Sequence, residues 1–374
     1  MTDYQCPLCD VRAPVESLAW CCPRCRGPWD LDFSAGAVPR GSLAGRAGSL
    51  WRYEEALPLS AADTTGCGPR AVSLGEGRTP LVPLTATATA KLDFLMPTLS
   101  FKDRGAVMLA ELARRLEPHR VIADSSGNAG TAIAAYCARA GLDCTVYLPE
   151  ATSPKKAEQI AAYGARPEPV PGDREAAARR AHAAAGEDGV FYASHVHNPY
   201  FLHGTKTYVY EVWEDLGGRL PDALVLPVGN GTLLLGAHLA VGELHAHGLI
   251  AQRPALIAVQ AAAVAPLATA FHAGREDITP SAAAPPTLAE GIAIPRPPRA
   301  RQVLSAVRAS GGTFHTVTDD QIRAAQRDLA ARGLFVEPTG AACWAAVLAY
   351  GLGDRTAVVP LCGAGAKTGL ATGG

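Results

Sequence analysis

The sequence has almost no net charge, because 34 Lys and Arg residues are balanced by 35 Asp and Glu residues, which gives −1 at pH 7. Without a basic excess, the chain lacks the electrostatic field that attracts nucleic acids or anionic membrane surfaces. It also lacks an uninterrupted apolar run of the ~20 residues that span a bilayer. Its first ten residues, MTDYQCPLCD, contain no apolar core of a secretory signal. We therefore expect a cytoplasmic protein that binds a small molecule, with neither nucleic acid nor membrane as a partner.

A disulfide framework is missing as well. Five of the ten cysteines lie within the first 25 residues, and the other five are scattered along the chain: Cys67, Cys137, Cys144, Cys343 and Cys362. This distribution favours a reducing compartment. The composition, 48% hydrophobic and 18% charged, excludes a disordered chain. A length of 374 residues predicts two or more lobes.

The N-terminal cysteines form two C-x-x-C pairs. Cys6 and Cys9 are separated by twelve residues from Cys22 and Cys25. Four thiolates at this spacing predict a tetrahedral zinc site without an open position, which is a structural site. Unrelated free thiols are the alternative, and Cys21 is an additional thiol that competes as a ligand. Zinc ribbons often bind nucleic acid or protein, but neither pair lies in a basic field, so we expect residues 1–35 to form an outlying cap.

The rest of the chain alternates short β-branched runs with long Ala-rich segments. Residues 36–75 are rich in Gly and Pro and read as a linker and an arm. Strands are predicted at 120–125, 144–149, 223–228, 256–260 and 356–361. Helices are predicted at 106–116, 129–141, 155–164, 173–186 and 321–333. This alternation predicts an α/β fold with parallel sheets that are covered on both faces.

Two glycine-containing turns follow predicted strands and open predicted helices. They are DSSGNAGTA (124–132) and PVGNGTLLLGA (227–237). The backbone N–H groups of such a helix N-terminus bind phosphate or carboxylate, whereas an ordinary capped turn is the alternative for either one. Neither turn has the G-x-G-x-x-G pattern of a dinucleotide site. The segment CGAGAKTG (362–369) is not a P-loop, because Ala366 stands where that motif needs Gly and only five residues follow. Two anion sites favour a ligand with more than one anionic group.

One lysine lies where a helix is expected to begin. The run Ser100-Phe101-Lys102-Asp103 predicts a capping box, in which Asp103 reaches back to the Ser100 amide. Lys102 would then lie in the first helical turn, where the helix dipole and the neighbouring Arg104 disfavour positive charge. A neutral amine adds to aldehydes, although a solvated surface lysine is the alternative. Together with the two anion sites, Lys102 favours a phosphate-bearing aldehyde cofactor held as a Schiff base.

Five segments occur in the order seen in pyridoxal-phosphate enzymes of the tryptophan-synthase-β class. They are EGRTPL (76–81), PTLSFKDRGA (97–106), SSGNAG (125–130), VGNGT (228–232) and EPTGAA (337–342). The chain resembles the threonine synthases most closely, some of which also carry an N-terminal zinc-ribbon-like segment. The resemblance implies a two-lobed α/β enzyme of fold type II with parallel sheets, with the cofactor in the cleft between the lobes. It is compatible with a homodimer.

The resemblance also implies a division of the chain and a role for each motif. Its segments are the zinc-ribbon-like module 1–35, the linker, arm and start of the large lobe 36–110, the small lobe 111–210 and the remainder of the large lobe 211–374. Lys102 would bind pyridoxal 5'-phosphate and shuttle the α-proton of the substrate. Asn128 would hydrogen-bond the phenolic oxygen of the cofactor. The substrate carboxylate would be bound by Ser125, Ser126, Gly127 and Asn128.

The remaining roles concern the cofactor phosphate and ring. The phosphate would be bound by Gly229, Asn230, Gly231 and Thr232. Phe101 would pack on the ring, and the thiol of Cys362 would face the pyridine nitrogen. A neutral partner moderates the electron sink, which favours elimination and replacement over transamination.

Two residues depart from the threonine synthase pattern, and a third feature points the same way. Cys362 stands where that pattern has Thr, and a thiol there resembles serine dehydratases. Phe201 stands where the pattern has an Arg that binds the substrate phosphate, and losing that cation should cost ~2–5 kcal/mol. Lys206 or Arg104 would have to compensate. The segment LAEGIAI around Glu290 resembles the dehydratases of threonine and serine.

These residues leave three hypotheses. The first is a threonine-synthase-like lyase that acts by elimination and replacement on a small amino acid, O-phosphorylated or not. The second is an L-serine or L-threonine dehydratase, or a β-replacement enzyme on an activated serine. The third, a non-catalytic cofactor-binding or regulatory protein, predicts a missing lysine or phosphate loop, and neither is missing. His195, His197 and His203 lack the flanking carboxylates expected of a second metal site.

Overall fold

The computed structural model describes residues 2–59, 72–125, 127–152, 154–279 and 285–367. Its chain divides into two compact units, Met1–Glu76 with Lys102–Thr205 (unit 1) and Gly77–Phe101 with Lys206–Gly374 (unit 2). The four-segment division predicted from the sequence stays a prediction. Among the described residues, no helix has both the length and the apolar composition needed to cross a membrane.

Unit 1 contains a four-stranded parallel sheet in the order β8-β7-β6-β9 and a three-stranded antiparallel sheet in the order β2-β1-β3. Its strands are β1 (Tyr4–Gln5), β2 (Arg12–Ala13), β3 (Asp30–Leu31), β6 (Arg120–Ala123), β7 (Cys144–Pro149), β8 (Arg166–Val170) and β9 (Val190–Tyr192). Its α-helices are α1 (Asp103–Leu116), α2 (Asn128–Ala140), α3 (Pro154–Ala162), α4 (Arg174–Ala184) and α5 (Pro199–Thr205). Short 3-10 helices span Val15–Ser17, Arg40–Gly45 and Leu50–Ala56.

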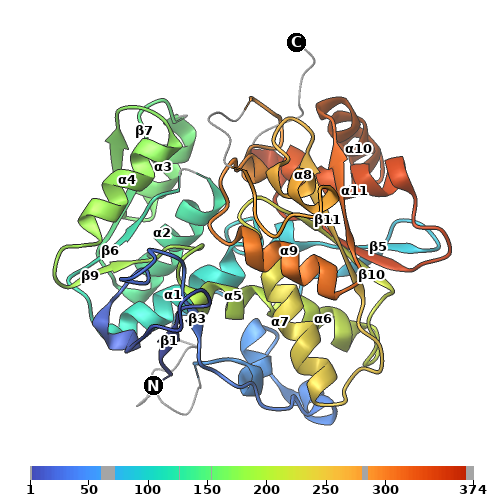
Figure 1. Cartoon of the computed structure of the whole chain (residues 1–374), viewed down its shortest axis with the longest axis horizontal. Helices are drawn as coiled ribbons and strands as arrows, with labels where there is room; N and C mark the ends of the chain where they lie inside the picture. The colour runs from blue at the N-terminus through green and yellow to red at the C-terminus, as the bar shows by residue number, and fades with distance from the viewer. Residues whose placement is uncertain (1, 60–71, 126, 153, 280–284, 368–374) are drawn as a thin grey trace. The chain divides into compact units, whose positions relative to one another are not determined.

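Unit 2 contains a six-stranded sheet in the order β12-β11-β10-β13-β5-β4, in which only the β4–β5 pair is antiparallel among the described strands. Its strands are β4 (Leu81–Pro83), β5 (Ala88–Lys91), β10 (Ala223–Pro227), β11 (Ala255–Ala261), β12 (Thr313–Val317) and β13 (Ala357–Pro360). Its α-helices, warm-coloured in Figure 1 from α7 onward, are α6 (Thr207–Asp215), α7 (Thr232–Ala246), α8 (Pro266–His272), α9 (Ala300–Ala309), α10 (Asp319–Ala331) and α11 (Pro338–Tyr350). Short 3-10 helices span Asp93–Leu95, Glu290–Ile292 and Gly365–Lys367. The predicted α/β fold with parallel sheets is confirmed.

Helices cover both faces of the large sheet, as the apolar strands predict. Ile257, Val259 and Ala261 of β11 share a hydrophobic cluster with residues of α11. Gln260, between them, accepts hydrogen bonds from the N–H groups of Leu267 and Ala268 in α8. Because alternate strand residues point to opposite faces, α11 and α8 cover opposite faces of the sheet.

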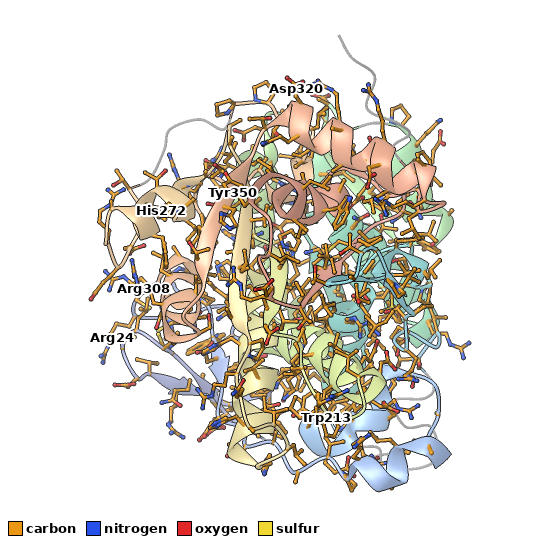
Figure 2. All side chains as sticks on the ribbon, turned by 90° about the vertical axis from the view of Figure 1, so that its right-hand side faces the viewer. Arg24, Trp213, His272, Arg308, Asp320 and Tyr350 are labelled. Carbon is orange, nitrogen blue, oxygen red and sulfur yellow. The ribbon has the colours of Figure 1, made fainter. Side chains whose placement is uncertain are left out.

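The hydrophobic packing of unit 2 extends to α6. Trp213 of α6, labelled in Figure 2, is buried, and its indole N–H donates to the Leu249 carbonyl at 3.3 Å.

The cysteine module is not an outlying cap, so that prediction is wrong. Tyr4, Cys22 and Trp29 are buried in one hydrophobic cluster with α1 residues and with Phe201. A module of this size buries too little apolar surface to be stable alone, and sharing the core of unit 1 supplies the missing burial.

Candidate active site

Lys102 immediately precedes α1, at its N-cap position. The predicted capping box is wrong, because α1 begins at Asp103 without a side-chain cap and Ser100 pairs instead with Gly363 in an isolated β-bridge. The Phe101 N–H donates to the Cys362 carbonyl at 2.9 Å, so the segment before Lys102 is anchored on the loop after β13. This contact joins residues far apart in sequence, which a local capping pattern does not reveal.

An aromatic ring lies beside the Lys102 ammonium. Its Nζ is 5.7 Å from the ring centroid of Phe201, which is fully buried. The ring of Phe201 in turn meets the imidazole of His195, with centroids 5.8 Å apart. Burial, helped by the charge of Lys102, lowers the pKa of His195 well below its usual value, so this imidazole is neutral at pH 7.

Gly105 makes the position of Phe201 possible. A Cβ at Gly105 would lie 2.4 Å from carbons of the Phe201 ring. Only glycine therefore allows α5 and the first turn of α1 to approach this closely. Neither Gly105 nor His195 was singled out as a site residue from the sequence, because the contact of each with Phe201 depends on tertiary packing.

The first glycine-containing turn joins β6 to α2. Ser125 is buried and its Oγ accepts a hydrogen bond from the Gly127 N–H at 3.3 Å. Asn128 is the first residue of α2, so its backbone lies at the positive end of that helix. A Cβ at Gly130 would lie 1.8 Å from the Ser125 carbonyl oxygen, which makes glycine obligatory there. Ser126 lies outside the described residues.

The second turn joins β10 to α7. Gly231 caps α7 in the left-handed conformation, with φ +79°, and a Cβ there would lie 2.3 Å from Val303 Cγ2. A Cβ at Gly229 would lie 2.9 Å from Ile292 Cα. The backbone of residues 229–232 therefore runs in a space that side chains would fill, at the N-terminus of a helix that starts at Thr232. Asn230 lies between the two glycines and is partly exposed.

The loop that follows β13 carries Cys362 and contacts Glu337 through Gly363. Cys362 is buried, with its Sγ 3.9 Å from the Pro360 carbonyl oxygen. The Glu337 N–H donates to the Gly363 carbonyl at 3.0 Å, and a Cβ at Gly363 would lie 2.4 Å from the Glu337 carboxyl carbon. Glu337 therefore fixes the loop that carries Cys362.

Two buried polar networks that were not expected from the sequence hold the ends of the EGRTPL segment. In unit 1, the carboxylate of Glu76 accepts hydrogen bonds from Trp51, Ser73, Leu74 and Tyr136. Burial nevertheless raises the pKa of Glu76.

In unit 2, the Thr79 hydroxyl donates to Asp93 at 2.7 Å. The buried Lys91 pairs with Glu211 at 2.9 Å and donates to the Thr79 carbonyl. A buried charge needs such a partner, so this lysine is held in place and serves the structure of the segment.

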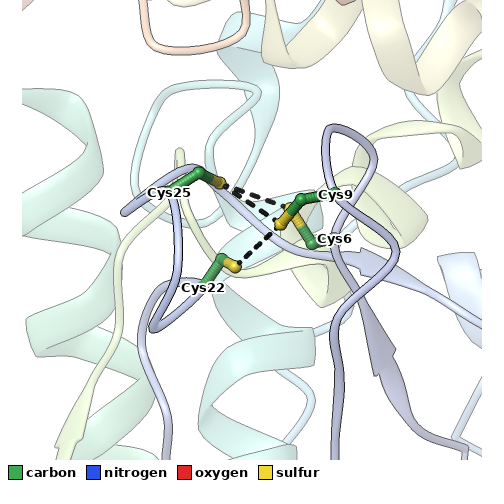
Figure 3. A group of neighbouring side chains, drawn as sticks. All are labelled: Cys6, Cys9, Cys22 and Cys25. Carbon is green, nitrogen blue, oxygen red and sulfur yellow. Dashed lines mark hydrogen bonds between the residues drawn. The ribbon is translucent and has the colours of Figure 1, made fainter.

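The four paired cysteines come together as predicted (Figure 3). Their Sγ atoms all lie within 4.8 Å of one another, and four of the pairs are 3.3–3.8 Å apart. A tetrahedron with Zn–S bonds of about 2.3 Å places the sulfurs about 3.8 Å apart, so the cluster fits a zinc ion. Burial raises the pKa of the Cys22 thiol, but hydrogen bonds from the N–H groups of Cys25 and Arg24 and from the neighbouring thiols outweigh it and bring the pKa to about 7. Cys21 is buried outside this cluster.

Comparisons with known proteins agree with this arrangement. The family model described as pyridoxal-phosphate dependent enzyme matches residues 72–363. A threonine synthase of Methanosarcina acetivorans is 31% identical over 91% of this chain and 85% of its own length. A threonine synthase of Methanocaldococcus jannaschii is 32% identical over 94% of this chain and 89% of its own length. A crystal structure of a threonine deaminase from T.th. is similar with a TM-score of 0.63 and 28% identity, over 76% of this chain and 92% of that one. The chain therefore belongs to the pyridoxal-phosphate dependent enzymes and is a threonine-synthase-like lyase.

Proposed function

We propose that the protein is a threonine synthase, which releases phosphate from O-phosphohomoserine and adds water to give threonine. The observation that carries the proposal is the extent of similarity to proteins named threonine synthase. The relative from Methanocaldococcus jannaschii aligns over 94% of this chain, so the alignment reaches beyond the family-model match at 72–363.

The described residues fit pyridoxal phosphate. The loop 229–232 combines a helix N-terminus with two glycines whose neighbours leave no room for a Cβ, an arrangement suited to a phosphate. We assign the phosphate to Gly229, Asn230, Gly231 and Thr232. When bound, the cofactor supplies an electron sink for the negative charge left at the substrate α-carbon.

The other assignments concern the cofactor aldehyde, its ring and the substrate. Lys102 Nζ would hold the aldehyde and then take and return the proton at the substrate α-carbon. Cys362 would present a neutral group to the pyridine nitrogen, and Phe101 would pack on the ring. The substrate carboxylate would be bound at the start of α2 by Ser125, Ser126, Gly127 and Asn128, of which Asn128 also binds the phenolic oxygen.

A dehydratase acting on L-serine or L-threonine is the second candidate, and Phe201 favours it. The threonine synthase pattern has an arginine at this position. In this chain the position holds Phe201, whose ring is fully buried against Gly105. A phenyl ring carries no positive charge, so Phe201 cannot bind a substrate phosphate as that arginine would. The similarity to a solved threonine deaminase agrees with this candidate, whereas Glu290 is exposed and adds little to it.

We further propose that the cysteine cluster binds a structural zinc ion. Its four ligands leave no open position for water, so this metal would not take part in the reaction. The reduced thiols suit a cytoplasmic protein. The homodimer stays a prediction, which sedimentation velocity of the purified protein would test.

The experiment offers the purified protein with pyridoxal phosphate three substrates separately: O-phosphohomoserine, L-threonine and L-serine. Phosphate and threonine from the first substrate alone would support threonine synthase activity. A 2-oxo acid from serine or threonine, without phosphate release from O-phosphohomoserine, would contradict it and support the dehydratase.

A further inference from the structure

Three aromatic residues flank the metal-binding cysteines. Tyr4 lies two residues before Cys6, Trp20 lies two residues before Cys22, and Trp29 follows Cys25. The rings of Tyr4 and Trp29 stack with centroids 5.6 Å apart and planes inclined by 10°. Because these rings are so close in sequence to the cysteines, whatever holds the cysteines together also fixes where the rings lie.

Trp20 contacts helix α4, strand β9 and the segment that follows β9. Its indole stacks on His182 of α4, with centroids 4.3 Å apart. Its edge-on neighbours are His197 at 5.1 Å and Tyr192 at 5.6 Å, and the Arg26 guanidinium lies 4.7 Å from its ring centroid. The module therefore reaches β9 and the segment that follows it.

Tyr4 and Trp29 reach the same segment by hydrogen bonds. The Trp29 N–H donates to the His197 carbonyl at 3.1 Å, and Asn198 Nδ2 donates to the Tyr4 hydroxyl at 3.2 Å. The carbonyl oxygen of the Asn198 side chain accepts from the Tyr200 N–H at 3.0 Å, at the start of α5. Three groups of the cysteine module thus hold residues 197 and 198: the Trp20 ring, the Tyr4 hydroxyl and the Trp29 N–H.

The segment continues directly to the surroundings of Lys102. The Phe201 N–H donates to the Asn198 carbonyl at 3.3 Å, and the centroid of the Phe201 ring lies 5.8 Å from that of His195 and 5.7 Å from the Lys102 ammonium. A shift of His197 and Asn198 would therefore move the Phe201 ring beside Lys102 and the His195 ring that contacts it. Each link in this path lies within unit 1.

We propose that a metal ion bound by the four cysteines holds residues 194–201 in place through Trp20, Tyr4 and Trp29, and thereby positions Phe201 against Lys102 and His195 against Phe201. These residues are positioning residues and do not touch the reacting atoms. The significance of the positioning for catalysis rests on the proposed role of Lys102.

The experiment measures amide hydrogen exchange in the full chain with pyridoxal phosphate, before and after zinc is removed with a chelator. Residues 194–201 are expected to exchange roughly tenfold faster without zinc, which corresponds to losing aromatic contacts of the usual strength. Strand β11 (Ala255–Ala261) of unit 2 serves as the internal reference and should not change. Unchanged exchange at 194–201, or an equal increase in β11, would overturn the proposal.

Variants distinguish the effect of metal binding from the effect of the aromatic contacts that lead to residues 194–201. Trp20→Ala leaves all four cysteines intact, so it should keep its zinc, measured by atomic emission, and still show the faster exchange at 194–201. Trp20→Phe should restore protection. Tyr350→Ala is the matched control, because Tyr350 stacks on His315 at 4.0 Å in unit 2.

A second readout concerns Lys102 itself. The rate at which borohydride fixes pyridoxal phosphate on Lys102 should fall in Trp20→Ala and recover in Trp20→Phe. The proposed path would be overturned if Trp20→Ala kept its zinc, its slow amide exchange at residues 194–201 and the wild-type rate of borohydride fixation. If Trp20→Ala does not fold, the zinc-stripped wild type decides alone. Cofactor fixed on another lysine would refute the role of Lys102, and the exchange result would still report on the path, since exchange requires neither substrate nor turnover.

Discussion

The two glycine-containing turns place similar sequences at the start of two helices but hold them differently. In unit 1, Gly127 has φ −103°, and among the described residues a Cβ there would meet only the Ser125 Oγ, at 3.9 Å. In unit 2, Gly231 has φ +79° and no room for a Cβ beside Val303. The first turn can therefore present side chains such as Ser125 and Asn128 to a ligand. The second turn presents backbone N–H groups, and its glycine is packed closely against Val303. This difference suits a substrate carboxylate in the first turn and a permanent cofactor phosphate in the second.

The largest effect is expected at Lys102, the residue of unit 1 that we propose reacts with the cofactor and substrate. Lys102→Ala should lower kcat by at least roughly 10³-fold, since a positioned general acid or base contributes about 10²–10⁴-fold and the covalent attachment to the cofactor would be lost too. Product formation from O-phosphohomoserine and from serine would be measured. Lys155→Ala is the matched control, because Lys155 is exposed in the first turn of α3. Equal losses in both variants would refute the assignment.

The sequence predicted the local parts of this site and missed the parts that depend on distant contacts. The strand at 144–149 and the four-cysteine cluster are confirmed, because each depends on pattern and spacing within a short segment. Strand β8 was missed because its sequence, RPEPV, contains two prolines, which an edge strand tolerates. The capping box failed because the segment before Lys102 pairs with the loop after β13. The approach of Phe201 to Gly105 depends on packing between α5 and α1, which no local pattern encodes.

The two turns should differ in how strongly the same substitution affects cofactor binding. Gly231→Ala should weaken pyridoxal phosphate binding at least about tenfold, because alanine in a left-handed conformation costs ~1–2 kcal/mol before the overlap with Val303 is added. Gly127→Ala should leave cofactor affinity within about threefold, since its φ suits any residue. Cofactor titration followed by absorbance would measure both. A larger loss in Gly127→Ala would reverse the comparison.

A substitution at Gly105 tests how closely α1 and α5 pack within unit 1. Gly105→Ala should lower the free energy of unfolding by ~1–3 kcal/mol, because the added methyl overlaps the buried Phe201 ring. Phe201→Leu should restore part of this loss when combined with Gly105→Ala, a coupling that a double-mutant cycle in urea would detect. Strictly additive effects would show that the two residues do not constrain each other.

The smallest expected effect distinguishes the buried carboxyl of Glu76 in unit 1 from the partly buried carboxyl of Asp328 in unit 2. The pKa of Glu76 is raised by burial, so folding favours its protonated form and its contribution to stability falls as pH rises above the ordinary carboxyl range. The pKa of Asp328 is lowered, chiefly by its hydrogen bonds from Arg332, so its contribution is present at neutral pH and is lost as pH falls. The stability of wild type relative to Glu76→Gln should therefore decrease with rising pH. The same difference for Asp328→Asn should increase, and thermal unfolding at several pH values would measure both signs.

The assignment of Lys102 is tested most directly by locating the cofactor. Wild-type protein with bound pyridoxal phosphate would be reduced with borohydride, digested and mapped by mass spectrometry. We predict that the cofactor mass is found on the peptide containing Lys102 and on no other lysine. Attachment to another lysine such as Lys91 or Lys206, or no stable attachment at all, would contradict the proposed site.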